Sequence, residues 1–132
     1  MFKEHIKVRF CETDALRHVS NTALAGWFES AREPIFKLFL PSLDVTQWPL
    51  ILARYSIDFK AQLYYGTEVE VRTEVARIGN SSFELRQQIW QSDTLCAEGM
   101  CTMVHFDHTS QRSEPIPEAI KTRLSEHLLT SE

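Results

Sequence analysis

Apolar residues recur at helical spacing in one early segment of the chain. Between Thr22 and Leu40 they form a wide apolar arc, which is typical of a helix enclosed by other elements. Pro34 falls inside this segment. Because proline cannot donate to residue 30 and clashes with its carbonyl, we expect a kink or a restart there. The apolar positions are Leu24, Trp27, Phe28, Ala31, Ile35, Leu38 and Phe39.

Most of the remaining chain alternates polar and apolar residues, as half-buried strands do. One such stretch, residues 5–10, precedes the helix, and four follow it, at residues 51–59, 69–75, 83–89 and 95–106. The short connections between neighbouring stretches favour antiparallel pairing, since a parallel pair needs a long crossover. A last amphipathic helix is expected over residues 118–129. The pattern predicts an α+β fold, with one buried helix early and an antiparallel meander after it.

Length and composition agree with this fold. The 132 residues, of which 43% are hydrophobic, suffice for a single domain with a buried core over residues 1–132. The net charge of −4 gives no general reason to expect nucleic acid or an anionic membrane as a partner. No apolar run is long enough to span a bilayer, and the first residues lack a signal-peptide core. Three cysteines without paired or metal-type spacing fit a reducing cytosol, so we expect a cytoplasmic protein.

The polar stretch between the first strand and the helix carries the candidate chemistry. Asp14 and His18 lie just before Ser20 and Asn21, two good helix N-caps. A helix start offers free N–H donors and partial positive charge, which can hold the oxyanion formed when an acyl carbon is attacked. Asp14 is therefore a candidate base or nucleophile, and His18 an orienting or proton-handling group. The backbone N–H of Asn21 is the candidate oxyanion donor, with Thr22 as a neighbour that can share the role.

The same stretch resembles a known family. The run VRFCETDALRHVSN, followed by WFESAR, is similar to the opening motif of the 4-hydroxybenzoyl-CoA thioesterase-like proteins of the hotdog fold, and most of all to acyl-CoA thioesterases of the YbgC/FadM type. Further similarity lies in YSIDFKAQLYYGTEVEV, VARIGNSSFELRQQIW and AEGMCTMVHFDHTSQRSEPIP, so it covers nearly the whole chain.

This resemblance implies a long helix clasped by a curved antiparallel sheet of about five strands, in homodimers or homotetramers with active sites at the subunit interface. It implies hydrolysis of an acyl thioester, carried by coenzyme A or by an acyl carrier protein, without a cofactor. Asp14, His18 and Asn21 match the family motif. Arg17 stands where many relatives carry Gly, and Ser20 replaces the first Asn of the usual pair.

Three residues are candidates for binding the rest of the substrate. Arg17 either narrows the pocket mouth or meets a substrate phosphate, and Arg54 is another cation that can bind phosphate. Trp48, in the loop between Pro41 and Pro49, either covers the acyl pocket or seals an edge of the core.

Each catalytic candidate has a plain alternative. Asp14 can merely cap its own turn, and His18 can be a structural histidine. Glu29 lies three residues before Arg32, and we favour an ion pair between them over a role for Glu29 as the attacking carboxylate.

Two further groups receive less weight. A Cys11–His18 nucleophile is disfavoured because a thiol at a strand end is usually buried. His105, Asp107 and His108 resemble metal ligands. If the last strand extends to His108, however, His105 and His108 point to opposite faces of it, so no metal site is expected. The alternatives to a hydrolase are an acyl-thioester hydratase or dehydratase and a non-catalytic acyl-binding protein.

Overall fold

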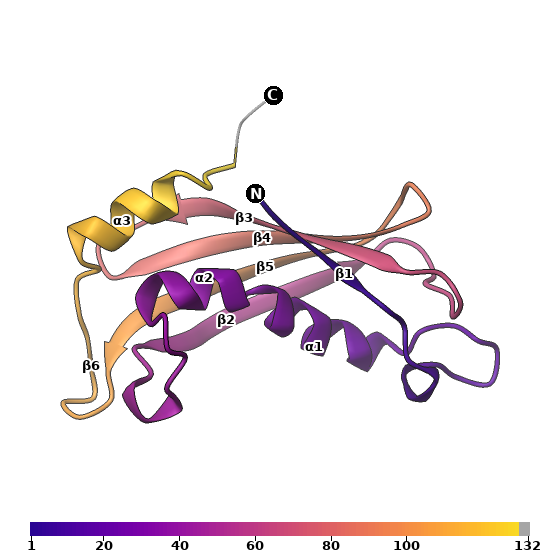
Figure 1. The fold of residues 1–132 in the computed structure, drawn as a ribbon, viewed down its shortest axis with the longest axis horizontal. Coiled ribbons are helices and arrows are strands. Elements are labelled where there is room, and N and C mark those ends of the chain that lie inside the picture. Colours follow the sequence, from indigo (N-terminus) through magenta and orange to yellow (C-terminus); the bar gives the residue numbers. More distant parts are fainter. Residues whose placement is uncertain (130–132) are drawn as a thin grey trace.

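The computed structural model describes residues 1–129, in which one antiparallel sheet curves around two consecutive helices (Figure 1). The strands lie in the order β1-β3-β4-β5-β2, and the short β6 pairs with β5. The predicted curved antiparallel sheet around an early helix is confirmed. In chain order the elements are β1 (Phe2–Ile6), η1 (Phe10–Glu12), α1 (Asn21–Ala31), α2 (Glu33–Phe39), η2 (Val45–Gln47), β2 (Leu50–Phe59), β3 (Val69–Ile78), β4 (Ser82–Gln91), β5 (Thr94–Asp107), β6 (Arg112–Ser113) and α3 (Glu118–Ser125).

The central helix is broken once, next to Pro34, as expected from the sequence. Arg32 ends α1, and α2 restarts with Pro34 in its first turn, where a missing N–H costs nothing. The break frees helix carbonyls beneath α1. Gln87 of β4 donates to the Phe28 carbonyl at 2.9 Å and accepts from Arg32 Nε at 3.1 Å. This buried network joins the helix to the middle of the sheet.

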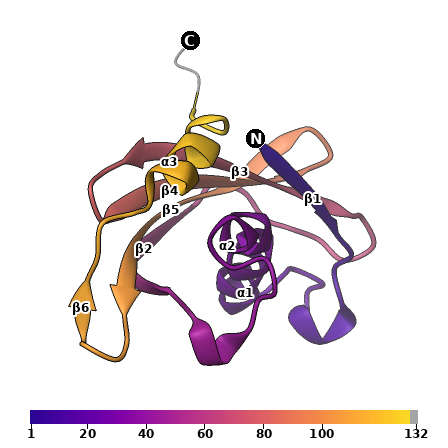
Figure 2. The ribbon, with the colours of Figure 1, turned by 60° about the vertical axis from the view of Figure 1, so that its left-hand side comes forward.

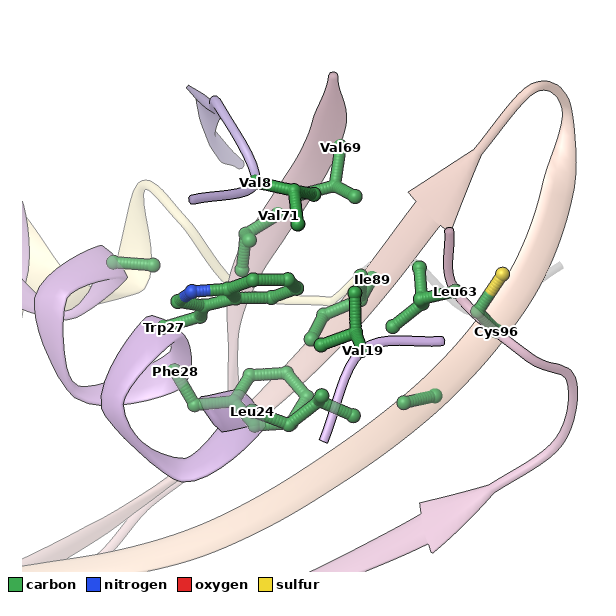
Figure 3. Packing of buried hydrophobic residues seen from close by; sticks show 12 residues of the cluster. Val8, Val19, Leu24, Trp27, Phe28, Leu63, Val69, Val71, Ile89 and Cys96 are labelled. Atoms are coloured by element: carbon green, nitrogen blue, oxygen red, sulfur yellow. The ribbon is translucent and has the colours of Figure 1, made fainter. Parts of the chain in front are cut away.

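The space between helix and sheet holds two apolar clusters. One surrounds α1, and Figure 3 shows its Trp27 and Phe28 packed toward the sheet residues Val71 and Ile89. The other surrounds α2 and includes Ile35. Figure 2, which looks along the helices, shows the sheet curling around them, so both clusters lie on its concave side. Of the helices within residues 1–129, none is long and apolar enough to cross a membrane.

Two predicted boundaries are wrong. The first strand was expected at residues 5–10, but β1 ends at Ile6, which pairs with Val69, the first residue of β3. Beyond that point the partner strand is missing, so the chain turns away and Phe10 is 75% exposed. The last helix was expected to reach residue 129, but α3 ends at Ser125. The backbone after it bonds to Val75 instead, through the His127 carbonyl at 2.9 Å and the Leu129 N–H at 2.6 Å.

Candidate active site

The turn formed by residues 12–20 (the 12–20 turn) leads into α1 as a narrow hairpin. Thr13 and Val19 form an antiparallel bridge, and the Ser20 N–H donates to the Glu12 carbonyl at 2.8 Å. At its tip, Asp14 Oδ1 accepts from the Leu16 N–H at 2.8 Å and the His18 N–H at 3.1 Å. Asp14 therefore does cap its own turn. Both bonds go to Oδ1, which leaves Oδ2 on an exposed side chain for a substrate or water.

Glu12 ties the base of this turn to the core. Its carboxylate accepts from the Trp27 indole N–H at 2.7 Å and from the Arg9 backbone N–H at 2.8 Å. Burial by itself raises the pKa of Glu12, but the hydrogen bonds from Arg9 and Trp27 outweigh burial and hold that pKa below its ordinary value. Glu12 is thus an anion at neutral pH that fixes the turn against α1.

The start of α1 leaves donors free. Ser20 takes the N-cap position, yet its side chain bonds to none of the first-turn N–H groups, and Asn21 is already the first helical residue. The predicted side-chain cap is therefore absent at Ser20. The N–H groups of Asn21 and Thr22 have no partner inside the helix, so they can receive an anion.

Two cavities flank this helix start. The larger, of about 540 Å³, is bounded by Asn21, Thr22 and Ala25 on one side and by Tyr55, Ile57 and Phe59 of β2 on the other; we call it the α1–β2 groove. A second cavity of about 470 Å³ lies on the other side of Thr22, next to Arg9, Cys11 and Glu12. Asp14 and His18 do not line either of them; both lie on the hairpin beside the helix start.

Two predicted site residues lie on the same hairpin as Asp14. His18 forms an antiparallel bridge with Tyr64, whose ring meets the imidazole edge-on at 5.2 Å. Arg17 is exposed and has φ of 65°, in the left-handed region where glycine is unstrained. The glycine that the family resemblance leads us to expect at this position would adopt this backbone conformation without strain.

The two other predicted substrate-binding residues lie elsewhere. A register shift between Leu52 and Arg54 places Arg54 opposite Thr102, and Arg54 lines a small cavity with Glu84 rather than the α1–β2 groove. Trp48 packs edge-on against Phe36 at 5.2 Å in the α2 cluster. This packing favours the plain alternative, in which Trp48 seals an edge of the core, although Trp48 also lines a cleft of about 400 Å³.

Three other expectations change as well. Arg32 is buried against Gln87 while Glu29 is exposed, so the predicted Glu29–Arg32 ion pair is not formed among the described residues. Cys11, expected to be buried, is exposed. His105 and His108 line one cleft of about 400 Å³, although no group of three metal-ligating side chains gathers within residues 1–129.

Two elements of this site were missed by sequence reasoning. Glu12 lies in the motif but carries no periodicity signal, and only the fold brings it to Trp27, fifteen residues later. The aromatic wall of the α1–β2 groove has no signal of its own in the sequence, because Tyr55 and Phe59 fit the alternation expected of any half-buried strand. Both are about half exposed, at 53% and 52%.

Comparison with known proteins identifies the family. The model of the thioesterase-like superfamily matches residues 8–124. The chain belongs to the thioesterase-like superfamily. The predicted family, the hotdog fold and the enzyme class, a thioesterase, are thereby confirmed. The comparison with curated proteins finds no match.

Solved thioesterase structures resemble this superfamily member closely. A predicted thioesterase from Bacillus stearothermophilus is 39% identical, with a TM-score of 0.95 over 99% of this chain and 98% of that one. A thioesterase from Thermus thermophilus, crystallised with coenzyme A and Zn, is 28% identical, with a TM-score of 0.82 over 92% and 95%. A 1,4-dihydroxy-2-naphthoyl-CoA thioesterase from Synechocystis, at 21% identity and a TM-score of 0.81 over 95% and 96%, shows the shared fold alone.

Proposed function

We propose that this thioesterase-like protein hydrolyses acyl-CoA thioesters to a free carboxylic acid and coenzyme A. The observation that carries the proposal is the Asp14 carboxylate, held with Oδ2 free on a hairpin that runs directly into the open start of α1. Thioester hydrolysis needs an activated attacking oxygen and a place for the charge that develops on the carbonyl oxygen. Asp14 provides the first and the N–H groups of Asn21 and Thr22 the second.

In this mechanism Asp14 either removes a proton from water or attacks the acyl carbon itself. In the first route the hydroxide adds to the carbonyl, and the carbon–sulfur bond then breaks to release the thiolate. In the second route the Asp14 carboxylate adds to the acyl carbon and the carbon–sulfur bond breaks, which releases the thiolate and leaves a mixed anhydride. Water then cleaves the anhydride to the free acid and the Asp14 carboxylate. A single turnover in ¹⁸O-water separates the two, since only the anhydride route can put solvent oxygen into Asp14. His18, whose backbone N–H bonds to the Asp14 carboxylate, orients that carboxylate.

The acyl group occupies the α1–β2 groove in this proposal. The groove begins at Asn21, where the carbonyl oxygen is held, and continues between Ala25 and the apolar side chains of Ile57 and Phe59. Coenzyme A is the proposed carrier because the Thermus relative was crystallised with it. Arg17, exposed at the tip of the hairpin, is the proposed contact for a coenzyme A phosphate.

We also propose that a second copy of the chain closes the site. Among the described residues β2 pairs only with β5, so one edge of a ten-residue strand is open. Tyr55 and Phe59 on that strand are exposed beside the groove. An open apolar edge normally requires covering, and a second copy laid along it would enclose the acyl group.

Asp14→Asn tests the catalytic assignment without removing the turn cap, because the amide oxygen can still accept from Leu16 and His18. We expect kcat to fall by about a hundredfold or more, the effect of losing a general base, measured as thiol release from acyl-CoAs of increasing chain length. Asp44→Asn is the matched control, since Asp44 also caps an exposed turn, through the Thr46 N–H at 3.0 Å. Wild-type rates for Asp14→Asn on every thioester would refute the assignment.

A further inference from the structure

The 12–20 turn is held from outside by the loop of residues 60–67. The Val19 N–H donates to the Leu63 carbonyl at 2.8 Å, and the Tyr65 N–H donates to the Arg17 carbonyl at 3.1 Å. Between these bonds His18 lies opposite Tyr64. Figure 3 shows Val19 and Leu63 packed together beside Ile89 in the α1 cluster. The placement of the turn thus depends on the placement of this loop.

The backbone of Tyr64 faces away from the turn. In an antiparallel bridge whose two bonds are made by the neighbouring residues, the central residue directs its own N–H and carbonyl to the opposite side. On that side lies the side chain of Gln91, the last residue of β4. Its Oε1 accepts from the Tyr64 N–H at 2.9 Å, and its Nε2 donates to the Tyr64 carbonyl at 2.9 Å and the Thr67 carbonyl at 2.7 Å.

The Gln91 amide therefore takes the place of a neighbouring strand. Two of its three bonds reproduce what a backbone partner would offer Tyr64, and the third fixes the end of the loop. Gln91 is only 7% exposed, so its removal would leave three backbone groups partly buried without partners. The chain of contacts is continuous from Gln91 through Tyr64 to His18, and from the His18 N–H to the Asp14 carboxylate.

We propose that Gln91 is a positioning residue for the hydrolytic site: through the loop of residues 60–67 it sets the position of the 12–20 turn, and hence of Asp14 relative to the start of α1. This inference rests on the proposed function of Asp14. Gln91 touches neither substrate nor reacting atoms. Its effect falls on kcat, because a carboxylate displaced by about 1 Å can lose about a hundredfold in rate while substrate binding persists.

The chain contains a matched control on the same strand. Gln87 is also buried and also makes three side-chain bonds, to Arg32, Phe28 and Thr73, beneath the middle of the helix. Methionine at either position keeps length and volume while removing the hydrogen bonds. We expect both Gln91→Met and Gln87→Met to lower the unfolding midpoint. A general loss of stability would affect both variants alike.

The decisive measurements are hydrogen exchange and steady-state kinetics at a temperature where both variants are folded. In Gln91→Met we expect the Val19 and Tyr65 amides to exchange about tenfold faster or more, and kcat to fall by about tenfold or more with KM changed by less than about threefold. Gln87→Met should retain protection at those two amides and keep kcat within about twofold of wild type.

Two results for Gln91→Met would overturn the positioning role. One is unchanged exchange of the Val19 and Tyr65 amides; the other is faster exchange of these amides with an unchanged kcat. Gln91→Glu keeps the acceptor for the Tyr64 N–H and replaces Gln91→Met in both measurements if that variant does not fold. If the wild-type protein hydrolyses no thioester, the proposed function fails, and the exchange data still decide whether Gln91 holds the turn.

Discussion

At the scale of single residues, the chain entering α1 is held by the Glu12 carboxylate. Glu12 joins three parts of the chain, since it bonds to Arg9 before the turn and Trp27 in α1, and its carbonyl accepts from Ser20 at the helix start. The Trp27 side chain is buried, so its indole N–H has no easy replacement for this acceptor. Removing the charge of Glu12 should therefore destabilise the segment that leads into α1.

This arrangement predicts a specific dependence of stability on pH. Because the pKa of Glu12 is lowered in the folded protein, its contribution to the free energy of unfolding is fully present above the ordinary carboxyl pKa and is lost as pH falls through the folded value. Glu12→Gln should cost about 1–3 kcal/mol at pH 7, measured by urea unfolding. The difference from wild type should shrink below about pH 4.

Trp27→Phe provides the control, because it removes the same hydrogen bond from the other side. The two single changes together should cost less than their sum, since both delete one interaction. If the free energies of unfolding of wild type and Glu12→Gln differed by a constant amount from pH 7 to pH 3, the proposed stabilising role of the Glu12 carboxylate would be contradicted.

At the scale of elements, α1 is held against the sheet by a close approach as well as by hydrogen bonds. Gly99, in the middle of β5, faces the ring of Phe28 so closely that an added Cβ would lie 3.2 Å from the ring. Phe28 is fully buried, so its ring has little room to move. The glycine therefore lets α1 lie close to the curved sheet at Phe28.

Two glycine-to-alanine substitutions, at Gly99 and Gly26, should change the free energy of unfolding in opposite directions. Gly99→Ala should lower the free energy of unfolding by about 1 kcal/mol, because overpacking outweighs the entropy gained by replacing a strand glycine. Gly26→Ala, on α1 with no atom within 4 Å of its added Cβ, should raise it by about 0.8–1 kcal/mol. Urea unfolding of both variants measures these changes in the free energy of unfolding. Stabilisation by Gly99→Ala would contradict the prediction and show that the Phe28 ring can move away from an added methyl group.

At the scale of the whole molecule, the two edges of the sheet differ. β1 is five residues long and largely polar, whereas β2 is ten residues long and leaves Leu52, Tyr55 and Phe59 exposed. Long apolar edges invite pairing, and charged residues prevent it. The β2 edge is therefore where we place the second copy.

Leu52→Lys should separate the proposed dimer. Leu52 is 40% exposed on β2, and burying a charge between two copies should weaken their association by about a hundredfold or more. Sedimentation should give wild type at twice the 15.3 kDa chain mass and the variant at that mass. The rate of thioester hydrolysis should fall with the loss of the partner.

His5→Lys makes the equivalent change on β1, the opposite edge, and keeps the partnership with Glu70. That variant should remain a dimer. A monomeric wild-type protein, or a Leu52→Lys variant that still sediments as a dimer, would argue against the β2 interface.

Local features were predictable because their causes are local. Helical spacing marked α1 and α2, the ring of Pro34 dictated the restart, and alternation marked the four strands after the helix. The motif around Asp14 and Asn21 indicated the correct family, because its residues are neighbours in the chain and can be recognised without knowing the sheet.

What depends on distant partners was decided only by the tertiary structure. β1 stops at Ile6 because β3 begins opposite it, and α3 stops at Ser125 because Val75 offers the backbone better partners. Gln91 meets Tyr64 across twenty-seven residues. Hydrogen-bond and packing partners far apart in the chain leave no periodic trace, so the sequence by itself determined the elements and the family, while the fold determined which side chains share a site.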